Sequence, residues 1–303
     1  MAITAQDVKA LREMTGVGMM DCKKALAASD GDMDKAVEWL REKGLAASAK
    51  KAGRIAAEGM AYAGVIGNVG VVVEVNAETD FVGKNEKFVD FVKGVAATVA
   101  SCAPADLDAL MECKYNGTDL TVTQQQQEMV LVIGENIKVR RFARFADGVS
   151  VPYIHAGGKI GVLVNLAVEG GIDVTEIGKD LAMQIAALNP RFLDKSQVTQ
   201  EVLDEEKKIL LAQMDNDPKM ASKPDQVKEK IVVGKLNKFY AENCLLQQTF
   251  VKDNEVTVEQ YMNAAAKKLG GTVALKDAVR FEKGEGIEKK QENFAEEIAK
   301  LAQ

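Results

Sequence analysis

Residues 60–76, MAYAGVIGNVGVVVEVN, decide the fold of this chain. Valine-rich runs lie on both sides of the sequence IGNVG. A glycine-containing turn between two such runs is typical of antiparallel strands joined in a β-hairpin. The second run is almost entirely apolar, which indicates a buried strand. The stretch therefore predicts a hairpin that belongs to the core of the protein.

The same pattern returns at residues 152–167, PYIHAGGKIGVLVNLA. Tyr62 aligns with Tyr153 and Gly67 with Gly158, at a constant offset of 91 residues. Both glycines fall where a turn needs a positive φ, so we expect them to serve the same backbone geometry. The sequence thus predicts two copies of one structural unit, each built on a hairpin.

Each hairpin is followed by mainly helical sequence and then by a third strand-like stretch, at residues 136–148 and 271–286. Phe145 in the first stretch matches Phe281 in the second at an offset of 136 residues, so the second copy is longer by 45 residues, 136 minus 91. Antiparallel sheets combined with helices in this way predict an α+β core.

The additional residues form a predicted helical hairpin at about 197–237. Apolar residues spaced by seven, such as Leu203 and Leu210, lie in its first helix at 201–214, and Val227 and Ile231 lie in its second at 224–236. A narrow apolar seam of this kind suggests coiled-coil packing. A homodimer through the hairpin and a simple antiparallel pair without a partner both remain open.

The first 45 residues predict a module of three helices. Thr4 and Asp32 are suitable N-caps for the first and third helices, and Gly44 is a suitable residue to end the third. Residues 46–59 follow as a basic helix or linker. So small a core usually belongs to something larger or binds a partner.

The C-terminal residues 284–303 predict a docking helix behind a flexible glycine joint. Phe294, Ile298 and Leu301 lie at positions i, i+4 and i+7, and so form one apolar face that must be buried on this protein or on another. Together the segments give an α+β fold with five parts. These are a three-helix module (1–45), a linker (46–59), two core subdomains (60–148 and 149–283) and a C-terminal helical module (284–303).

Composition excludes several classes of protein. The net charge of −6 and the pI near 5.2 argue against nucleic-acid binding, and the basic residues Lys50, Lys51 and Arg54 are better explained as a solvated face. No run of about eighteen apolar residues indicates a membrane span. The N-terminus has no signal segment, which predicts a cytoplasmic location.

The cysteines predict reduced thiols. They are scattered along the chain without a C-x-x-C pair, which favours neither a zinc site nor a disulfide framework. The four are Cys22, Cys102, Cys113 and Cys244.

A search for catalytic or ligand-binding motifs finds little. The chain has one histidine, His155, and neither glycine-rich turn fits a P-loop or a dinucleotide-binding fingerprint. We therefore expect no catalytic residues, no metal site, no cofactor and no nucleotide site. An enzyme remains possible at this point, but no motif supports it.

Two stretches carry a resemblance to a known family. Residues 11–26, LREMTGVGMMDCKKAL, and residues 74–84, EVNAETDFVGK, resemble the two signature segments of elongation factor Ts, the family of guanine-nucleotide exchange factors for elongation factor Tu. The segments IGENIKVRR, HAGGKIGVLV and RFEKGEGIEK are similar to family segments in the same order, so the resemblance covers essentially the whole chain.

The resemblance implies where the partner binds. In the family, the Asp and Phe of the T-D-F-V segment enter the GTPase domain of the partner beside its magnesium site, and here they are Asp80 and Phe81. Thr79 and Val82 complete the segment. The other implied contacts are Arg12, Met19, Met20, Ile133, Gly134, His155 and the C-terminal helix with Phe294, Ile298 and Leu301.

Several alternatives remain for these residues. Met19 and Met20 could be buried within their own module, and Phe81 could pin the start of a helix to the sheet. His155 could be a purely structural residue. We also expect Thr79 or Asp80 to cap the helix that follows. The alternative function is that of a chaperone-like partner which stabilises the same GTPase without nucleotide exchange.

Overall fold

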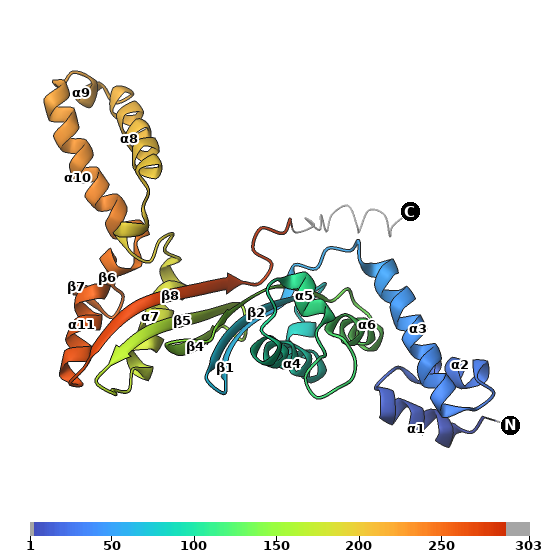
Figure 1. The fold of residues 1–303 in the computed structure, drawn as a ribbon. Coiled ribbons are helices and arrows are strands. Elements are labelled where there is room, and N and C mark those ends of the chain that lie inside the picture. Colours follow the sequence, from blue (N-terminus) through green and yellow to red (C-terminus); the bar gives the residue numbers. More distant parts are fainter. Residues whose placement is uncertain (1–2, 289–303) are drawn as a thin grey trace.

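A computed structural model describes residues 3–288 of the 303-residue chain. The molecule is elongated, with two antiparallel sheets in the middle, a small helical bundle at one end and a helical hairpin that projects from the other (Figure 1). The mixture of helices and antiparallel sheets confirms the predicted α+β class. The predicted C-terminal helix lies outside the described residues.

The first unit is a three-stranded antiparallel sheet, in the order β1-β2-β3, covered on one face by helices. Its core is formed by valines of β2 and by one face of α4, which contributes the fully buried Phe88 and Phe91. The elements are β1 (Glu58–Ile66), β2 (Val69–Ala77), η1 (Val82–Lys84), α4 (Glu86–Cys102), α5 (Leu107–Glu112), α6 (Val122–Ile133) and β3 (Lys138–Phe145).

The second unit repeats this design with the strand order β4-β5-β8. The helix α7 packs on β4 and β5, and α11 packs on β8. Its elements are β4 (Val149–His155), β5 (Ile160–Glu169), α7 (Thr175–Leu188), η2 (Lys195–Gln197), η3 (Leu245–Gln247), β6 (Thr249–Phe250), β7 (Asp253–Thr257), α11 (Val258–Lys268) and β8 (Thr272–Glu282). A small apolar cluster that includes Ala61, Val72 and Leu163 joins the two sheets.

The strand register confirms the duplication. Gly70 lies opposite Phe145 in the first sheet, and Gly161 lies opposite Phe281 in the second. The pairing of the central strand with the third strand also shifts at the same position in both sheets, between Glu74 and Val75 and between Asn165 and Leu166. The additional residue lies in the third strand, at Arg140 in the first sheet and at Lys276 in the second. Because one shifted residue would turn every later side chain to the other face, matching bulges show that the two units share their pairing.

The turns of the two hairpins differ, so the prediction that Gly67 and Gly158 serve the same geometry was wrong. In the first hairpin Ile66 pairs with Val69, which leaves a two-residue turn, whereas in the second His155 pairs with Ile160. Gly67 faces open space at φ +60°. Gly158, at φ +98°, is buried against the first unit and its carbonyl oxygen accepts a hydrogen bond of 2.8 Å from the amide of Ala61.

The N-terminal bundle consists of α1 (Ala5–Thr15), α2 (Met19–Ala28) and α3 (Met33–Lys51). Thr4 and Asp32 cap α1 and α3 as predicted. Gly44 does not end α3, because the helix continues through it to Lys51. A Cβ atom at Gly44 would lie 3.3 Å from the carbonyl oxygen of Gln127 in α6, so the glycine permits close helix packing instead of a helix end.

The predicted helical hairpin is confirmed and stands out from the second unit (Figure 1). It consists of α8 (Gln200–Asp215), the short α9 (Pro218–Ala221) and α10 (Asp225–Asn243). Leu210, Met214, Val232 and Leu236 are buried between α8 and α10. Val227 is exposed instead of lying in the seam, because α10 contacts α8 through the face that carries Val232 and Leu236. The homodimer through this hairpin stays a prediction.

The prediction of four reduced thiols was wrong for one pair. Cys102 and Cys113 form a disulfide, with their Cα atoms 6.5 Å apart, while Cys22 and Cys244 are free and buried. The chain reverses direction after α4 and returns along it, which brings together two cysteines that form no sequence motif. Within the described residues, no helix is long and apolar enough to cross a membrane.

Candidate functional site

The segment that follows β2 is a turn before it becomes a helix. After Ala77 the chain passes through residues 78–81 and a short 3-10 helix, and α4 begins only at Glu86. Asn85 caps α4, since its Oδ1 atom accepts hydrogen bonds from the amides of Lys87 and Phe88 at 3.0 and 3.4 Å. The prediction that Thr79 or Asp80 caps this helix was therefore wrong.

Phe81 projects from this turn with 81% of its surface exposed, and Asp80 beside it is exposed too. Val82 is only 6% exposed and packs in the core of the first unit, which corrects its place among the surface candidates. Gly83 lies so close to the sheet that a Cβ atom would be 2.8 Å from the carbonyl oxygen of Gly59. Val82 and Gly83 thus pin the turn to the sheet, and Phe81 is left free.

A set of hydrogen bonds, here called the clasp, fixes the turn to the end of α6. The clasp consists of Glu78, Thr79, Glu135 and Asn136. Thr79 donates to Glu135 from its amide at 2.9 Å and from its hydroxyl at 2.6 Å. Glu78 accepts a hydrogen bond of 2.6 Å from the amide of Asn136. Side-chain rotation at Glu135 or Thr79 is thereby restricted, which orients the backbone that carries Phe81.

The residues before the clasp, Ile133 and Gly134, end α6. Gly134 adopts φ +86° as the C-cap, and its carbonyl oxygen accepts a hydrogen bond of 2.6 Å from Lys51. Gly134 is exposed, and Ile133 is half-buried against the first core. Ile133 and Gly134 thus lie next to the Phe81 turn, because the following residue, Glu135, accepts the hydrogen bonds from Thr79. Glu135 was missed from sequence, although it directly follows the predicted pair.

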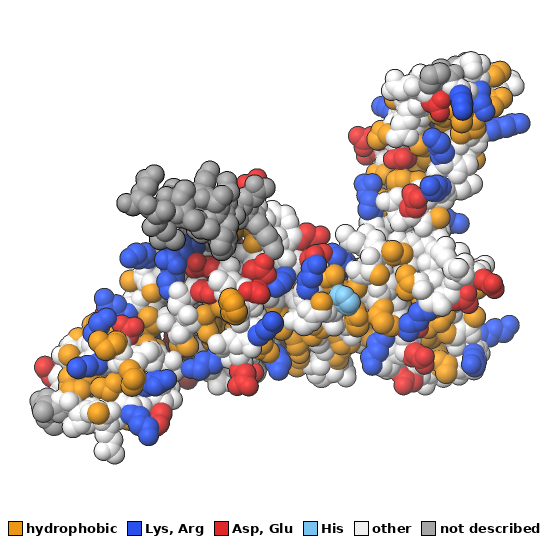
Figure 2. All heavy atoms as spheres, turned by 180° about the vertical axis from the view of Figure 1, so that it is seen from behind, with side chains coloured by type: hydrophobic (Ala, Val, Ile, Leu, Met, Phe, Trp, Pro, Cys, Tyr) orange, Lys and Arg blue, Asp and Glu red, His pale blue; other side chains and the backbone are white. Residues whose placement is uncertain are grey.

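The N-terminal bundle presents a second group of exposed candidates. Met19 and Met20 are 58% and 67% exposed, which excludes burial within their own module, and Arg12 is also exposed. Met14 is 65% exposed and was missed. Figure 2 shows hydrophobic side chains gathered over the N-terminal helices. Exposed methionines suit adaptable protein interfaces because their side chains are flexible and polarisable.

His155 lies at the end of β4, in the second unit. Its side chain is exposed, and its Nδ1 atom lies 3.0 Å from the hydroxyl of Tyr153. Figure 2 shows the imidazole on the molecular surface. The Tyr153 contact orients the ring without burying it, so His155 remains available to a partner.

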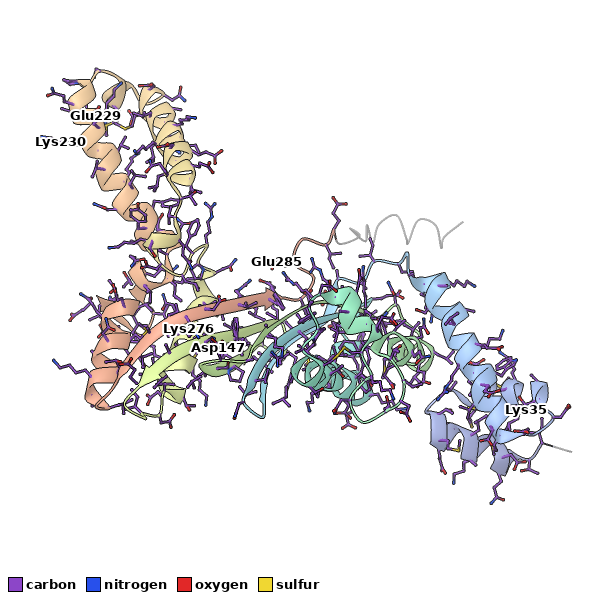
Figure 3. The ribbon with its side chains drawn as sticks, in the orientation of Figure 1. Lys35, Asp147, Glu229, Lys230, Lys276 and Glu285 are labelled. Carbon is purple, nitrogen blue, oxygen red and sulfur yellow. A yellow bond between two sulfur atoms is a disulfide. The ribbon has the colours of Figure 1, made fainter. Side chains whose placement is uncertain are left out.

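A buried charge cluster between the two units was also missed. Glu74, which is 0% exposed, accepts hydrogen bonds from Arg140 at 2.9 Å, from Arg141 at 2.5 Å and from the amide of Gly284 at 2.8 Å. Burial alone would raise the pKa of Glu74, but these hydrogen bonds outweigh it and lower the pKa. Glu285, in the turn after β8, completes the cluster (Figure 3).

The Glu74 cluster fixes the chain where it leaves the second unit. Gly284 and Glu285 follow β8, so the hydrogen bond from Gly284 and the ion pair of Glu285 fix the turn directly after this strand. A signal for it exists in the sequence, since an acid in an otherwise apolar strand requires buried cationic partners. In the second sheet, Lys276 of β8 forms an ion pair with Asp147, which lies just before β4 on the other side of β5 (Figure 3).

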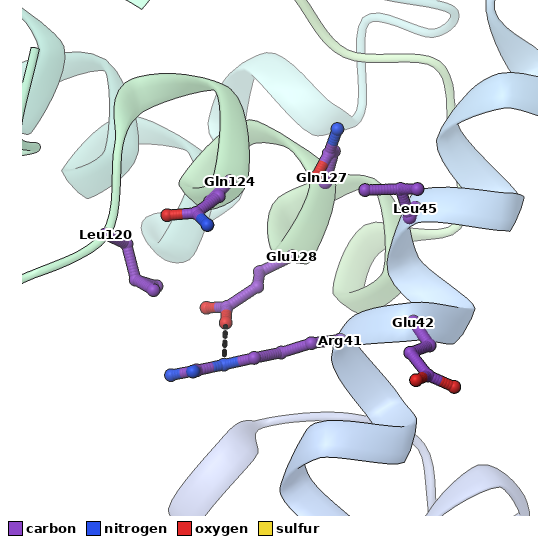
Figure 4. A pocket seen from close by; sticks show the side chains of 7 residues that line it. All are labelled: Arg41, Glu42, Leu45, Leu120, Gln124, Gln127 and Glu128. Carbon is purple, nitrogen blue, oxygen red and sulfur yellow. Dashed lines mark ion pairs between the residues drawn. The ribbon is translucent and has the colours of Figure 1, made fainter. Parts of the chain in front are cut away.

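Cavities lie along the contact between the N-terminal bundle and the first unit. One cavity of about 290 Å³ lies between α3 and α6, and the ion pair of Arg41 with Glu128, at 3.4 Å, spans it (Figure 4). Burial raises the pKa of Glu128 although Arg41 opposes the shift. In the part of the chain that the structure describes, no group of acidic, histidine or cysteine side chains could hold a metal ion.

Comparisons with known proteins agree on one family. A family model described as Elongation factor TS matches residues 78–285. Proteins named Elongation factor Ts from Clostridium kluyveri and Trichlorobacter lovleyi are 48% and 50% identical to this chain, over 98% and 100% of it and over 98% and 99% of their own length. The relative of that name from Magnetococcus marinus is 47% identical over 100% of both chains.

Proposed function

Because the chain belongs to the elongation factor Ts family of translation elongation factors, we propose that it is a guanine-nucleotide exchange factor for elongation factor Tu. In this proposal it promotes release of GDP and lets GTP bind again, without making or breaking a covalent bond. It acts in the cytoplasm as a binding protein and not as an enzyme.

The exposure of Phe81 carries the proposal. A large aromatic side chain that is 81% exposed on a fixed turn buries little apolar surface and therefore contributes little to the stability of the isolated chain. Burial of such a ring in a partner's pocket contributes about 1.5–3 kcal/mol. Because the clasp already orders the turn, little of this energy is lost to conformational entropy on binding.

The binding energy of Phe81 holds the partner in a conformation that binds Mg²⁺ and phosphate poorly. Asp80 cannot act by repulsion, because a carboxylate attracts Mg²⁺. It therefore displaces the partner's own magnesium ligands or forms new hydrogen bonds with them. The effect is reciprocal: the factor weakens nucleotide binding by the same ratio by which the nucleotide weakens binding of the factor.

The remaining contacts spread along the molecule. Arg12, Met19 and Met20 reach the partner from the N-terminal bundle, and Ile133 and Gly134 support the contact near the Phe81 turn. His155 docks on a different domain of the partner. In this arrangement Thr79 positions the turn through the clasp, and Val82 anchors it from below.

Release of labelled GDP from elongation factor Tu tests the proposal. A small amount of this protein is expected to accelerate release at ordinary Mg²⁺ concentration, and the protein alone is expected to retain no labelled nucleotide. A stable complex with unchanged GDP release would contradict exchange and favour a stabilising partner.

A further inference from the structure

One face of α4 carries a segment that returns from α5. Phe91, Gly94, Thr98 and Cys102 follow one another at spacings of three and four residues, so they form one face of the helix. The chain after α5, residues 113–116, runs along this face. The contact therefore continues from the first half of α4 to its last residue.

Several contacts hold the returning segment in place, and three of them join it to α4 along this face. The ring of Tyr115 stacks on Phe91 with centroids 5.8 Å apart, and it covers Gly94, where a Cβ atom would lie 1.9 Å from the Tyr115 hydroxyl oxygen. The amide of Asn116 donates a hydrogen bond of 2.9 Å to the hydroxyl of Thr98. The third contact is the disulfide of Cys102 and Cys113.

The four cysteines divide into two accessible and two inaccessible ones. Cys102 is exposed and Cys113 is half-buried, whereas Cys22 and Cys244 are fully buried. Burial raises the pKa of Cys22, and it raises the pKa of Cys244 to about 11. Since the thiolate is the reacting species, Cys22 and Cys244 are poor partners for exchange and serve as internal controls.

We propose that Cys102 and Cys113 form a reversible thiol–disulfide exchange site that takes small disulfides as oxidants and small thiols or dithiols as reductants. Exposed disulfides have higher reduction potentials than buried structural ones and are typically the labile, regulatory or catalytic ones. The surface position of Cys102 gives a reagent access, and Cys113 lies within reach to resolve the mixed disulfide.

The exchange forms the Cys102–Cys113 disulfide and breaks the small disulfide in two steps. The thiolate of Cys102 attacks one sulfur of the small disulfide, forms a mixed disulfide and releases one small thiolate. The thiolate of Cys113 then attacks the Cys102 sulfur and releases the second. The protein loses two electrons and two protons, the small disulfide gains two electrons, and the two thiolates released take up the protons. Reduction by a small thiol follows the same steps in reverse.

The site controls how firmly Tyr115 is held. Tyr115 lines a cavity of about 400 Å³ together with Gly16 of the N-terminal bundle and Lys87, whose Nζ atom donates a hydrogen bond of 3.3 Å to the Gly16 carbonyl oxygen. With the disulfide formed, Tyr115 is covalently tied to the end of α4. With the thiols reduced, the segment keeps its non-covalent contacts, which are the ring stacking, the Asn116 hydrogen bond, the hydrogen bonds of the Tyr115 hydroxyl to the carbonyl oxygens of Asp90 and Phe91, and the bridge between Lys114 and Thr121, but it loses the covalent tie.

The full-length protein is incubated with oxidised or reduced glutathione, unfolded, and alkylated to count thiols by mass spectrometry. We expect two alkylated cysteines after oxidised glutathione, Cys22 and Cys244, and four after reduced glutathione. Four alkylated cysteines after both treatments, or glutathione retained on Cys22 or Cys244, would overturn the proposal.

Amide hydrogen exchange measures how firmly the returning segment is held, which the thiol count does not show. The Asn116 amide is expected to exchange roughly tenfold faster or more in the reduced protein, because the covalent constraint on the segment is lost. The double variant Cys102→Ser, Cys113→Ser is expected to show the fast exchange in both buffers. Equal exchange of Asn116 in oxidised and reduced wild-type protein would contradict the proposed control of the segment.

Discussion

Glu135 accepts both hydrogen bonds that Thr79 donates, one from its amide at 2.9 Å and one from its hydroxyl at 2.6 Å. This contact joins the end of α6 to the turn that carries Phe81, across 56 residues of sequence. The Glu135 carboxylate thus helps to order the turn before any partner binds, together with the hydrogen bond of Glu78 and the packing of Val82. Ordering in advance reduces the entropy that binding would otherwise cost.

We expect Glu135→Ala to reduce the acceleration of GDP release about three- to tenfold. Two hydrogen bonds are lost, each with a net contribution of about 1 kcal/mol, and water partly replaces them at this half-exposed position. Release of labelled GDP measures the effect, with urea unfolding as the check on stability. The control is Glu112→Ala, an exposed acid on α5. An equal loss in both variants would exclude a positioning role for Glu135.

We expect Phe81→Ala to leave the free energy of unfolding nearly unchanged and to slow GDP release tenfold or more. Truncation of an aromatic hot spot of about 2 kcal/mol implies a loss of this size. The effect should shrink when Mg²⁺ is chelated, because release then no longer depends on the metal site.

Phe88→Ala is the matched control for Phe81. Phe88 is fully buried in the first unit, so its truncation should lower the free energy of unfolding by about 3–5 kcal/mol. If Phe81→Ala destabilises the chain to the same degree, or releases GDP as fast as the parent protein, Phe81 is not the residue that acts on the partner.

Asp80→Asn tests the charge at the turn without a change in helix capping. Since Asn85 and not Asp80 caps α4, we expect this variant and Asp80→Ala to slow GDP release alike and to unfold at the same urea concentration as the parent. Asn85→Ala should instead lose about 0.5–2 kcal/mol of stability through the lost cap. A destabilised Asp80→Asn variant would show that the carboxylate supports the fold.

The repeated hairpins could be predicted because their signal is local. Valine-rich strands with glycine turns fix pairing over a few residues, and Phe145 and Phe281 then align the third strands. Gly44 was misread for a related reason: a glycine after a helical pattern usually marks a helix end, and only the distant contact with Gln127 makes it a packing position. At Gly44 the packing of α3 against α6 thus outweighs the local preference of glycine for a helix end.

Long-range partners could not be predicted. The disulfide of Cys102 and Cys113, the clasp contact of Glu135 and the identity of the partners of Glu74 all depend on how separate segments meet, which no short spacing encodes. The acid in the apolar strand signals only that Glu74 needs cationic partners, and not which residues they are. The candidate role of Phe81 came from the family resemblance, since exposure of an aromatic residue is not visible in a sequence. The exposure of Phe81 became visible only in the structure.

The two turn glycines should respond differently to substitution. We expect Gly67→Ala to lower the free energy of unfolding by about 1 kcal/mol, because only the strain of its positive φ is involved. Gly158→Ala should cost at least twice as much, because a Cβ atom would also lie 2.7 Å from Cγ of Met60. Urea unfolding of both variants measures the difference. Equal losses would mean that the contact with Met60 relaxes without cost.

The buried Glu74 cluster predicts a defined dependence of stability on pH. The pKa of Glu74 is lower in the folded chain than its ordinary value of 4.5, so its stabilising effect is complete above that value. The effect is lost as the pH falls through the lower pKa of the folded state. At pH 7, Glu74→Gln leaves Arg140 and Arg141 without their buried partner and should cost about 3 kcal/mol. Urea unfolding from pH 7 to 3 should show a constant difference at first, which shrinks below about pH 4.5.

Glu285→Gln is the control for this pH series. Glu285 pairs with Arg141 at 3.1 Å in the same cluster but is exposed, so its loss should cost no more than about 1 kcal/mol at any pH. A difference between Glu74→Gln and the parent that stays the same at pH 3 and pH 7 would show that Glu74 acts through packing and not through its charge. The two arginines would then have to find other partners in the folded chain.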